Sequence, residues 1–110
     1  MDVESLLKKL SESPDLKPFR GLIEPLLAHD RGRRSDLVRT LRIYLATGAN
    51  ASETADRLFL HRNSVLYRLT RIQKLLGLDL REPEARLVLR LGLLVIDAEE
   101  RSFDDEAEHP

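Results

Sequence analysis

The sequence predicts an all-α domain of five or six helices that contains a helix-turn-helix. Apolar residues recur at spacings of three and four along most segments, which is the helical period. Aromatic residues make up only 5% of the chain and Trp is absent, whereas Leu is abundant. A chain of 110 residues is long enough for one helical core. There is no Cys, which excludes disulfides and thiolate metal sites and fits a reducing cytoplasm.

The first 30 residues are expected to form an N-terminal helical segment. Asp2 can cap a short helix that carries Leu6, Leu7 and Leu10, and the SESPD stretch then interrupts it. A second helix is predicted over 18–29. Pro25 lies inside this helix and predicts a kink or a split there. The polar DRGRRS stretch, residues 30–35, is expected to be a loop.

Two further helices lead to the central motif. Ser35 is the expected N-cap of a helix that reaches Thr47, and Gly48 suits the left-handed residue that ends a helix. Asn50 is expected to cap the next helix, with Glu53 three residues later as in a capping box. This helix is short and ends near residue 58.

The segment over residues 52–76 has the pattern of a helix-turn-helix. Ala55 is small enough for a close crossing of two short helices, and residues 59–61 form the turn. The second helix, 62–76, is called the reader helix below, and Gly77 ends it. Its apolar stripe is Val65, Leu69, Ile72 and Leu76. The opposite face holds side chains that donate and accept hydrogen bonds, as a helix in the major groove of DNA requires: Asn63, Ser64, Tyr67, Thr70, Arg71 and Lys74.

The last predicted helix begins at Pro83 and continues to about Glu100. Its apolar residues cover most of the helix circumference, so several of its sides must be covered. In a small protein a second subunit can provide the cover, and we therefore expect a homodimer through this helix. The tail, residues 101–110, is acidic and polar, and is expected to be disordered. The intervening helix-turn-helix domain spans 31–100.

Charge is strongly segregated along the chain although the net charge is only −1. Residues 31–76 hold 10 basic and 3 acidic residues, whereas residues 77–110 hold 4 basic and 10 acidic ones. The basic block coincides with the helix-turn-helix. A patch of one sign attracts a polyanion whatever the total charge, so we expect double-stranded DNA as the partner.

The candidate DNA-binding residues lie mostly on the reader helix. Arg62 is expected to contact a phosphate or a guanine, and Asn63, Ser64, Tyr67 and Arg71 to contact base edges or the backbone. Lys74 is expected to contact a phosphate, or else to be a solvated surface lysine.

Six other positions have two interpretations each. Arg68 can clamp a phosphate or form a structural ion pair, and His61 can cap the reader helix or touch phosphate. Ser52 can bind phosphate at a helix N-terminus or serve only in capping. The arginines at 31, 33 and 34 can reach phosphates or form an ordinary solvated loop.

The pattern resembles the C-terminal DNA-binding domain of the PucR family of bacterial transcription regulators. The similar stretches are PLLAHD (25–30), residues 36–80, and residues 86–89, and the most specific part is HRNSVLYRL (61–69). The family commonly has Thr where this chain has Ser64, which keeps the hydroxyl. Members usually carry an additional N-terminal sensory region. The resemblance therefore implies either a free-standing reader or a piece of a longer regulator.

The expected function is sequence-specific DNA binding in transcription control. The alternative is a helical protein-interaction module whose basic face binds an acidic partner. No Gly-rich phosphate loop, nucleophile elbow or metal-ligand spacing is present in the sequence, so we expect no enzymatic activity, no cofactor and no metal. The longest apolar stretch, residues 91–96, is too short to cross a bilayer. A cytoplasmic protein is expected, and the sequence does not identify an effector.

Overall fold

The computed structural model describes residues 2–33 and 35–108, and side chains up to residue 102. Within these residues the chain forms seven α-helices, one short 3-10 helix and no strand, which confirms the all-α prediction. The α-helices, in chain order, are α1 (Val3–Ser11), α2 (Lys17–Arg20), α3 (Glu24–Arg33), α4 (Leu37–Ala46), α5 (Ala51–Leu58), α6 (Arg62–Leu76) and α7 (Pro83–Glu108), with the 3-10 helix at Pro14–Leu16.

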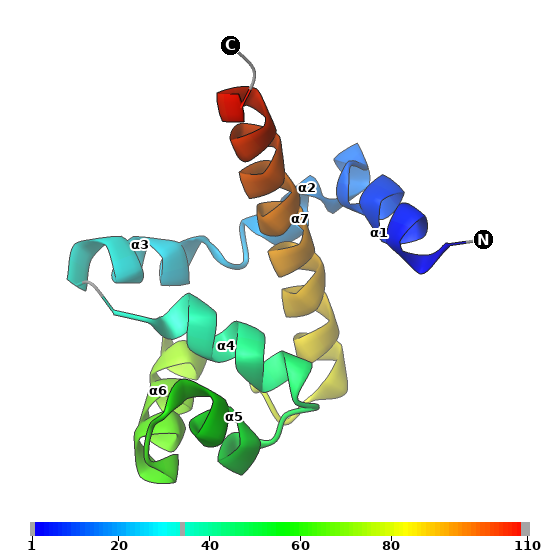
Figure 1. Ribbon diagram of the computed structural model, residues 1–110. Helices are drawn as coiled ribbons and strands as arrows, with labels where there is room; N and C mark the ends of the chain where they lie inside the picture. Colours follow the sequence, from blue (N-terminus) through cyan, green and yellow to red (C-terminus); the bar gives the residue numbers. More distant parts are fainter. Residues whose placement is uncertain (1, 34, 109–110) are drawn as a thin grey trace.

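The helices surround one apolar core. Fully buried Ile23, Leu26, Leu41, Ile72 and Leu89 come from the segments around α3, α4, α6 and α7. Figure 1 shows α7 as the long central helix, with α5 and α6 at one end of the molecule. The C-terminal end of α7 lies at the other end, and α1 and α6 lie on opposite sides of α7. The helix-turn-helix is therefore remote from α1 and from the C-terminal end of α7.

The second predicted helix is split, as its proline indicated, and this split raises the helix count to seven. A turn over residues 21–23 separates α2 from α3, and Pro25 lies in the first turn of α3. Proline is tolerated there because the first amides of a helix have no acceptor within it. α2 packs closely on α7: a Cβ at Gly92 would lie 2.5 Å from the Phe19 carbonyl oxygen. Only glycine leaves room for this contact.

Two predicted boundaries are wrong in the same direction, because both helices run further than expected. α3 continues through residues 30–33, which were expected to form a loop, and its last turn carries Arg31 and Arg33. Basic side chains interact favourably with the carbonyl end of a helix. α7 continues to Glu108 through the stretch expected to be disordered, since no Gly or Pro interrupts it between residues 93 and 108. Residues 109–110 lie outside the described part.

The N-terminus of α4 is capped by Asp30 and not by Ser35 as predicted. The Asp30 carboxylate accepts hydrogen bonds from the backbone N–H of Leu37 at 2.9 Å and of Val38 at 3.0 Å. The Ser35 hydroxyl donates to the same carboxylate at 2.5 Å and contacts His29 Nδ1 at 2.7 Å. The prediction failed because the capping group belongs to the preceding helix and lies seven residues before the first amide it binds.

The other predicted caps of the helix-turn-helix are confirmed. Asn50 accepts a hydrogen bond from the Glu53 N–H at 2.9 Å at the start of α5. Gly77 ends α6 with a φ of 65°. Phe59 ends α5 in the same left-handed region, with a φ of 56°, although its side chain is 94% exposed. A residue with a Cβ is strained in this region, and exposed Phe59 gains little from burial in return.

We predict that Phe59→Gly raises the free energy of unfolding by about 0.5–1 kcal/mol, because glycine adopts the left-handed conformation without steric cost. Urea unfolding followed by circular dichroism measures the change. Phe59→Ala is the matched control and should give little gain, since alanine keeps the Cβ. Gly77→Ala should lower stability by about 1 kcal/mol. A loss of stability in Phe59→Gly would mean that the phenyl ring makes stabilising contacts.

We also predict that Asp30→Ala lowers the free energy of unfolding by about 1–2 kcal/mol, because it removes the cap of α4. Asp36→Ala is the control: Asp36 precedes the helix directly, but its side chain makes no capping hydrogen bond. Its ion pairs are partly exposed, so the effect should be below about 1 kcal/mol. Equal losses in both variants, measured by the same urea titration, would contradict the assignment of the cap to Asp30.

Candidate nucleic-acid interface

The orientation of α6 is set by its buried stripe. Val65 and Ile72 have no accessible surface and Leu69 is 7% exposed, and all three belong to the core. Leu76, the fourth residue of the predicted stripe, is half-buried against that core. α6 contacts α3, α4 and α5 along this side. Since the stripe occupies one side, the opposite side of the helix faces solvent.

The solvent side of α6 holds most of the predicted DNA-binding residues together. Five of these side chains are exposed in its first turns or just before it, and Lys74 is exposed further along, whereas Arg71 is half-buried. We call this set the reader face: His61, Arg62, Asn63, Ser64, Tyr67, Arg71 and Lys74. It presents two guanidinium groups, an amide and two hydroxyls, which are groups that hydrogen-bond to base edges and phosphates.

His61 and Arg68 have defined roles in the fold. His61 is the N-cap of α6, and its Nδ1 atom accepts a hydrogen bond from the Asn63 N–H at 3.3 Å. Arg68 is turned toward α4: its Nη1 donates to the hydroxyl of buried Thr40 at 3.1 Å and lies 4.0 Å from Asp36 Oδ2. Arg68 therefore makes a structural contact with α4, and a contact between Arg68 and a phosphate stays a prediction.

Ser52 lies apart from the reader face, in the first turn of α5. Its side chain is exposed and takes part in no hydrogen bond within residues 2–33 and 35–102. The neighbouring Glu53 side chain does not complete a capping box, because it pairs with Arg57 at 3.0 Å. The Ser52 hydroxyl is therefore available to a ligand at the start of α5. Its position is set by α5 and not by the reader helix.

A groove of about 670 Å³ runs beside the reader face. We call it the junction groove, because its second wall is the junction between α3 and α4. α6 contributes Asn63, Ser64, Tyr67, Arg68 and Arg71 to one wall. The other wall and the floor come from His29, Arg33, Ser35, Asp36, Leu37 and Leu60. Sequence periodicity could not reveal this groove, since it depends on how two separate segments approach α6.

Arg31 and Arg33, both in the last turn of α3, are in different surroundings. Arg31 donates from Nη2 to Glu24 Oε1 at 2.9 Å, and Glu24 also accepts from Arg20 at 3.0 Å. The guanidinium groups of Arg31 and Arg20 hold the pKa of Glu24 below its usual range. Arg33 is exposed and lines the junction groove. Residue 34 lies outside the described residues.

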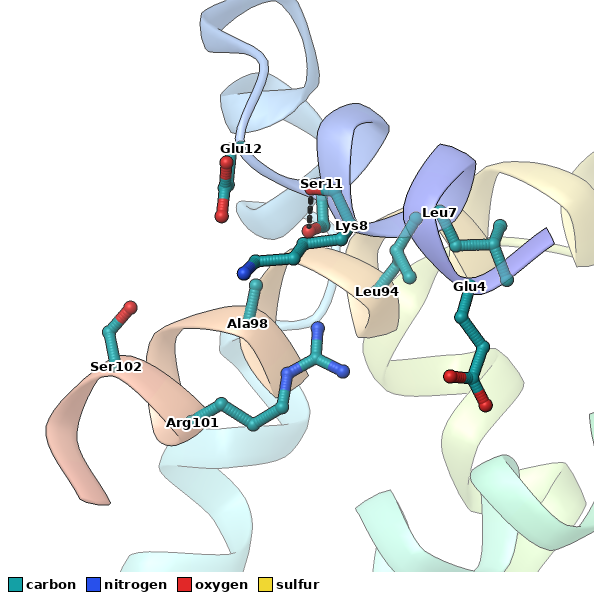
Figure 2. Close-up of a pocket in the computed structure, with 9 residues that line it drawn as sticks. All are labelled: Glu4, Leu7, Lys8, Ser11, Glu12, Leu94, Ala98, Arg101 and Ser102. Atoms are coloured by element: carbon teal, nitrogen blue, oxygen red, sulfur yellow. Dashed lines mark hydrogen bonds between the residues drawn. The ribbon is translucent and has the colours of Figure 1, made fainter. Parts of the chain in front are cut away.

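A second cleft, of about 570 Å³, lies between α1 and α7. Figure 2 shows Lys8 and Arg101 extending into it from the two helices, with Glu4 and Glu12 along its edge. The dashed bond joins the Ser11 hydroxyl to the Lys8 carbonyl at 2.7 Å. Two basic and two acidic groups offset one another, so this cleft does not favour a polyanion as the reader face does.

Comparisons with known proteins show which family the sequence is similar to. The sequence model of the PucR C-terminal helix-turn-helix domain matches residues 37–95. The purine catabolism regulatory protein of Bacillus subtilis (strain 168) is 44% identical over 92 residues, which are 84% of this chain and 17% of that protein. The carbohydrate diacid regulator of Escherichia coli (strain K12) is 42% identical over 57 residues, 52% of this chain and 15% of that protein.

A third relative is the proline-responsive transcriptional activator PutR of Bacillus subtilis (strain 168), 32% identical over 71 residues. These residues are 64% of this chain and 17% of PutR, so the chain spans less than a fifth of the length of all three relatives. No solved structure matches the chain. Every helix in the described residues is too short or too polar to span a bilayer. Since the matching family model covers more than half of the sequence, the chain belongs to the PucR C-terminal helix-turn-helix domain family.

Proposed function

We propose that this chain binds duplex DNA in a sequence-specific manner as the DNA-binding part of a transcription regulator, with α6 in the major groove. The observation that carries the proposal is the reader face, which lies opposite the buried Val65 and Ile72. The names of the relatives support the same function, since they describe a purine catabolism regulatory protein, a carbohydrate diacid regulator and a proline-responsive transcriptional activator. The proposed activity is binding, without a catalytic step, and implies a cytoplasmic protein.

The residues of the reader face have different proposed tasks. Arg62 and Asn63 lie in the first turn of α6, where side chains reach most deeply into a major groove. Arginine pairs with guanine and asparagine with adenine through two hydrogen bonds, so both can read bases. Ser64 and Tyr67 can donate to bases or phosphates. Lys74 lies three turns along and is proposed to contact a phosphate, as Ser52 is at the start of α5.

We predict that Arg62→Ala and Arg71→Ala each weaken binding to a selected site by about 1–3 kcal/mol and relax specificity at one base position. Lys74→Ala should weaken binding to all sequences alike and flatten the salt dependence. The measurement is a titration of labelled duplexes at several salt concentrations, with the site first selected from random DNA and a scrambled duplex as the control. Salt-insensitive binding of equal strength to both duplexes would favour the alternative, a module whose basic face binds an acidic protein.

We also propose a homodimer through the last helix, α7. The surface available for the dimer is narrower than the sequence pattern predicted. Much of α7 is covered within the chain: Leu89, Leu93 and Ile96 are buried, and α1, α2 and α4 pack on the helix. Leu87 remains 57% exposed, and Leu91 is half-buried. A groove of about 630 Å³ lies between Leu87 and Leu91 of α7 and the leucines of α1. A two-fold dimer that reads adjacent half-sites would hold its reader helices about 34 Å apart.

We predict that Leu87→Glu converts a dimer into a monomer in sedimentation experiments, because a carboxylate cannot be buried there without a partner. The variant should lose affinity for a site with two half-sites but keep its affinity for a single half-site. Glu100→Lys, an exposed charge change on the same helix, is the control and should leave the mass unchanged. A wild-type chain that stays monomeric up to millimolar concentration would exclude this dimer.

A further inference from the structure

The junction groove shares one wall with the reader face. Asn63, Tyr67 and Arg71 belong to both. The second wall comes from the end of α3 and the start of α4, and both helices pack on α6. Whatever fills the groove therefore lies beside the DNA that α6 is proposed to bind. In a duplex, the feature that borders the major groove on each side is a sugar–phosphate backbone.

The charge of the junction groove suits a phosphate chain. Arg33 lines one wall, and Arg68 and Arg71 line the other. Asp36 is the one carboxylate among the described lining residues. Its Oδ2 atom lies 3.5 Å from Arg39 Nη1 and 4.0 Å from Arg68 Nη1, so two guanidinium groups offset its charge. Three arginines and one aspartate give the described lining a net charge of +2, and the excess lies on the α6 wall.

The floor of the junction groove is apolar. Leu37 is 4% exposed at the start of α4, and Leu60 lies half-buried in the turn before α6. A DNA strand alternates charged phosphates with deoxyribose rings, whose carbon atoms are apolar. A net positive lining above an apolar floor matches this alternation. A small inorganic anion would match it less well, because the leucines would stay in contact with water or charge.

Arg31 and Arg33 lie two residues apart on α3 but are not equivalent. Arg31 holds Glu24 at 2.9 Å and is absent from the groove lining. Arg33 lines the groove, and no hydrogen bond or ion pair joins it to the described side chains. The two residues have the same charge and both belong to the last turn of α3, so they form a matched pair for experiment.

We infer that the junction groove seats the sugar–phosphate backbone that borders the major groove occupied by α6, and that Arg33 contacts a phosphate there. This inference rests on the proposed function. The α3–α4 junction then acts as a second, sequence-independent DNA contact beside the base-reading helix. It sets the position of α6 along the duplex, since phosphate contacts fix register and base contacts supply specificity.

The first experiment compares Arg33→Gln with Arg31→Gln in titrations of the selected and scrambled duplexes. Loss of one phosphate contact lowers the slope of log affinity against log salt by about 0.9. The ratio of wild-type to Arg33→Gln affinity should therefore fall about 3.5-fold between 50 and 200 mM salt, equally for both duplexes. Arg31→Gln should keep the wild-type slope, and Arg33→Lys should restore most of it. Thermal melting checks that every variant is folded.

The second experiment locates the contact. Single phosphates of the selected site are replaced by neutral methylphosphonates, and each modified duplex is titrated with the wild type and with Arg33→Gln. At one phosphate beside the bound major groove, neutralisation should weaken the wild type severalfold and leave Arg33→Gln unaffected. At every other phosphate, the fold-loss from neutralisation and the fold-loss from Arg33→Gln should multiply, as expected of independent changes.

The outcomes separate this inference from the function on which it rests. If the wild type binds the selected site and Arg71→Ala loses affinity, but Arg33→Gln keeps the full salt slope and couples to no phosphate, the groove does not hold the backbone. An equal decrease of the salt slope in Arg31→Gln and Arg33→Gln would also overturn the inference. It would indicate that the two arginines act through the general positive potential of the surface and not through one phosphate contact. If the wild type binds neither duplex, the proposed function itself fails.

Discussion

The burial of Val65 and Ile72 determines how this domain presents its reader helix. Neither side chain has accessible surface, so α6 cannot rotate about its axis without exposing apolar area or driving polar groups into the core. The side that faces solvent is consequently fixed. His61 and Gly77 define the two ends of the helix, and with the rotation fixed, these ends set which residues can enter a groove of DNA.

The contact between α6 and α4 divides the basic residues between folding and proposed binding. Arg68 is positively charged and lies on the reader helix, yet it bonds Thr40 on α4 and is only 29% exposed. Arg71, three residues later, has no such partner among the described residues and lines the junction groove. A guanidinium group that joins two helices fixes their separation. One that is free of such contacts can exchange water for a phosphate or a base at lower cost.

The acidic residues are arranged so that the reader face keeps its positive charge. The Asp30 carboxylate binds the amides of α4, and the Glu24 carboxylate pairs with two arginines. Neither acidic residue lines the junction groove. Most of the acidic excess of the chain lies after residue 76, and α7 extends toward the end of the molecule opposite α5 and α6. A net charge of −1 is therefore compatible with a surface that attracts DNA.

The sequence by itself determined what depends on neighbours within about four residues. The stripe of α6, the Asn50 cap, the left-handed Gly77 and the split near Pro25 are local, because helical period and backbone sterics decide them. Contacts between distant segments were decided by the tertiary structure. Asp30 caps α4 from the previous helix, Arg68 binds α4 rather than facing solvent, and α2 fits on α7 only at Gly92. Each depends on the packing of whole helices, which a pattern along one segment does not specify.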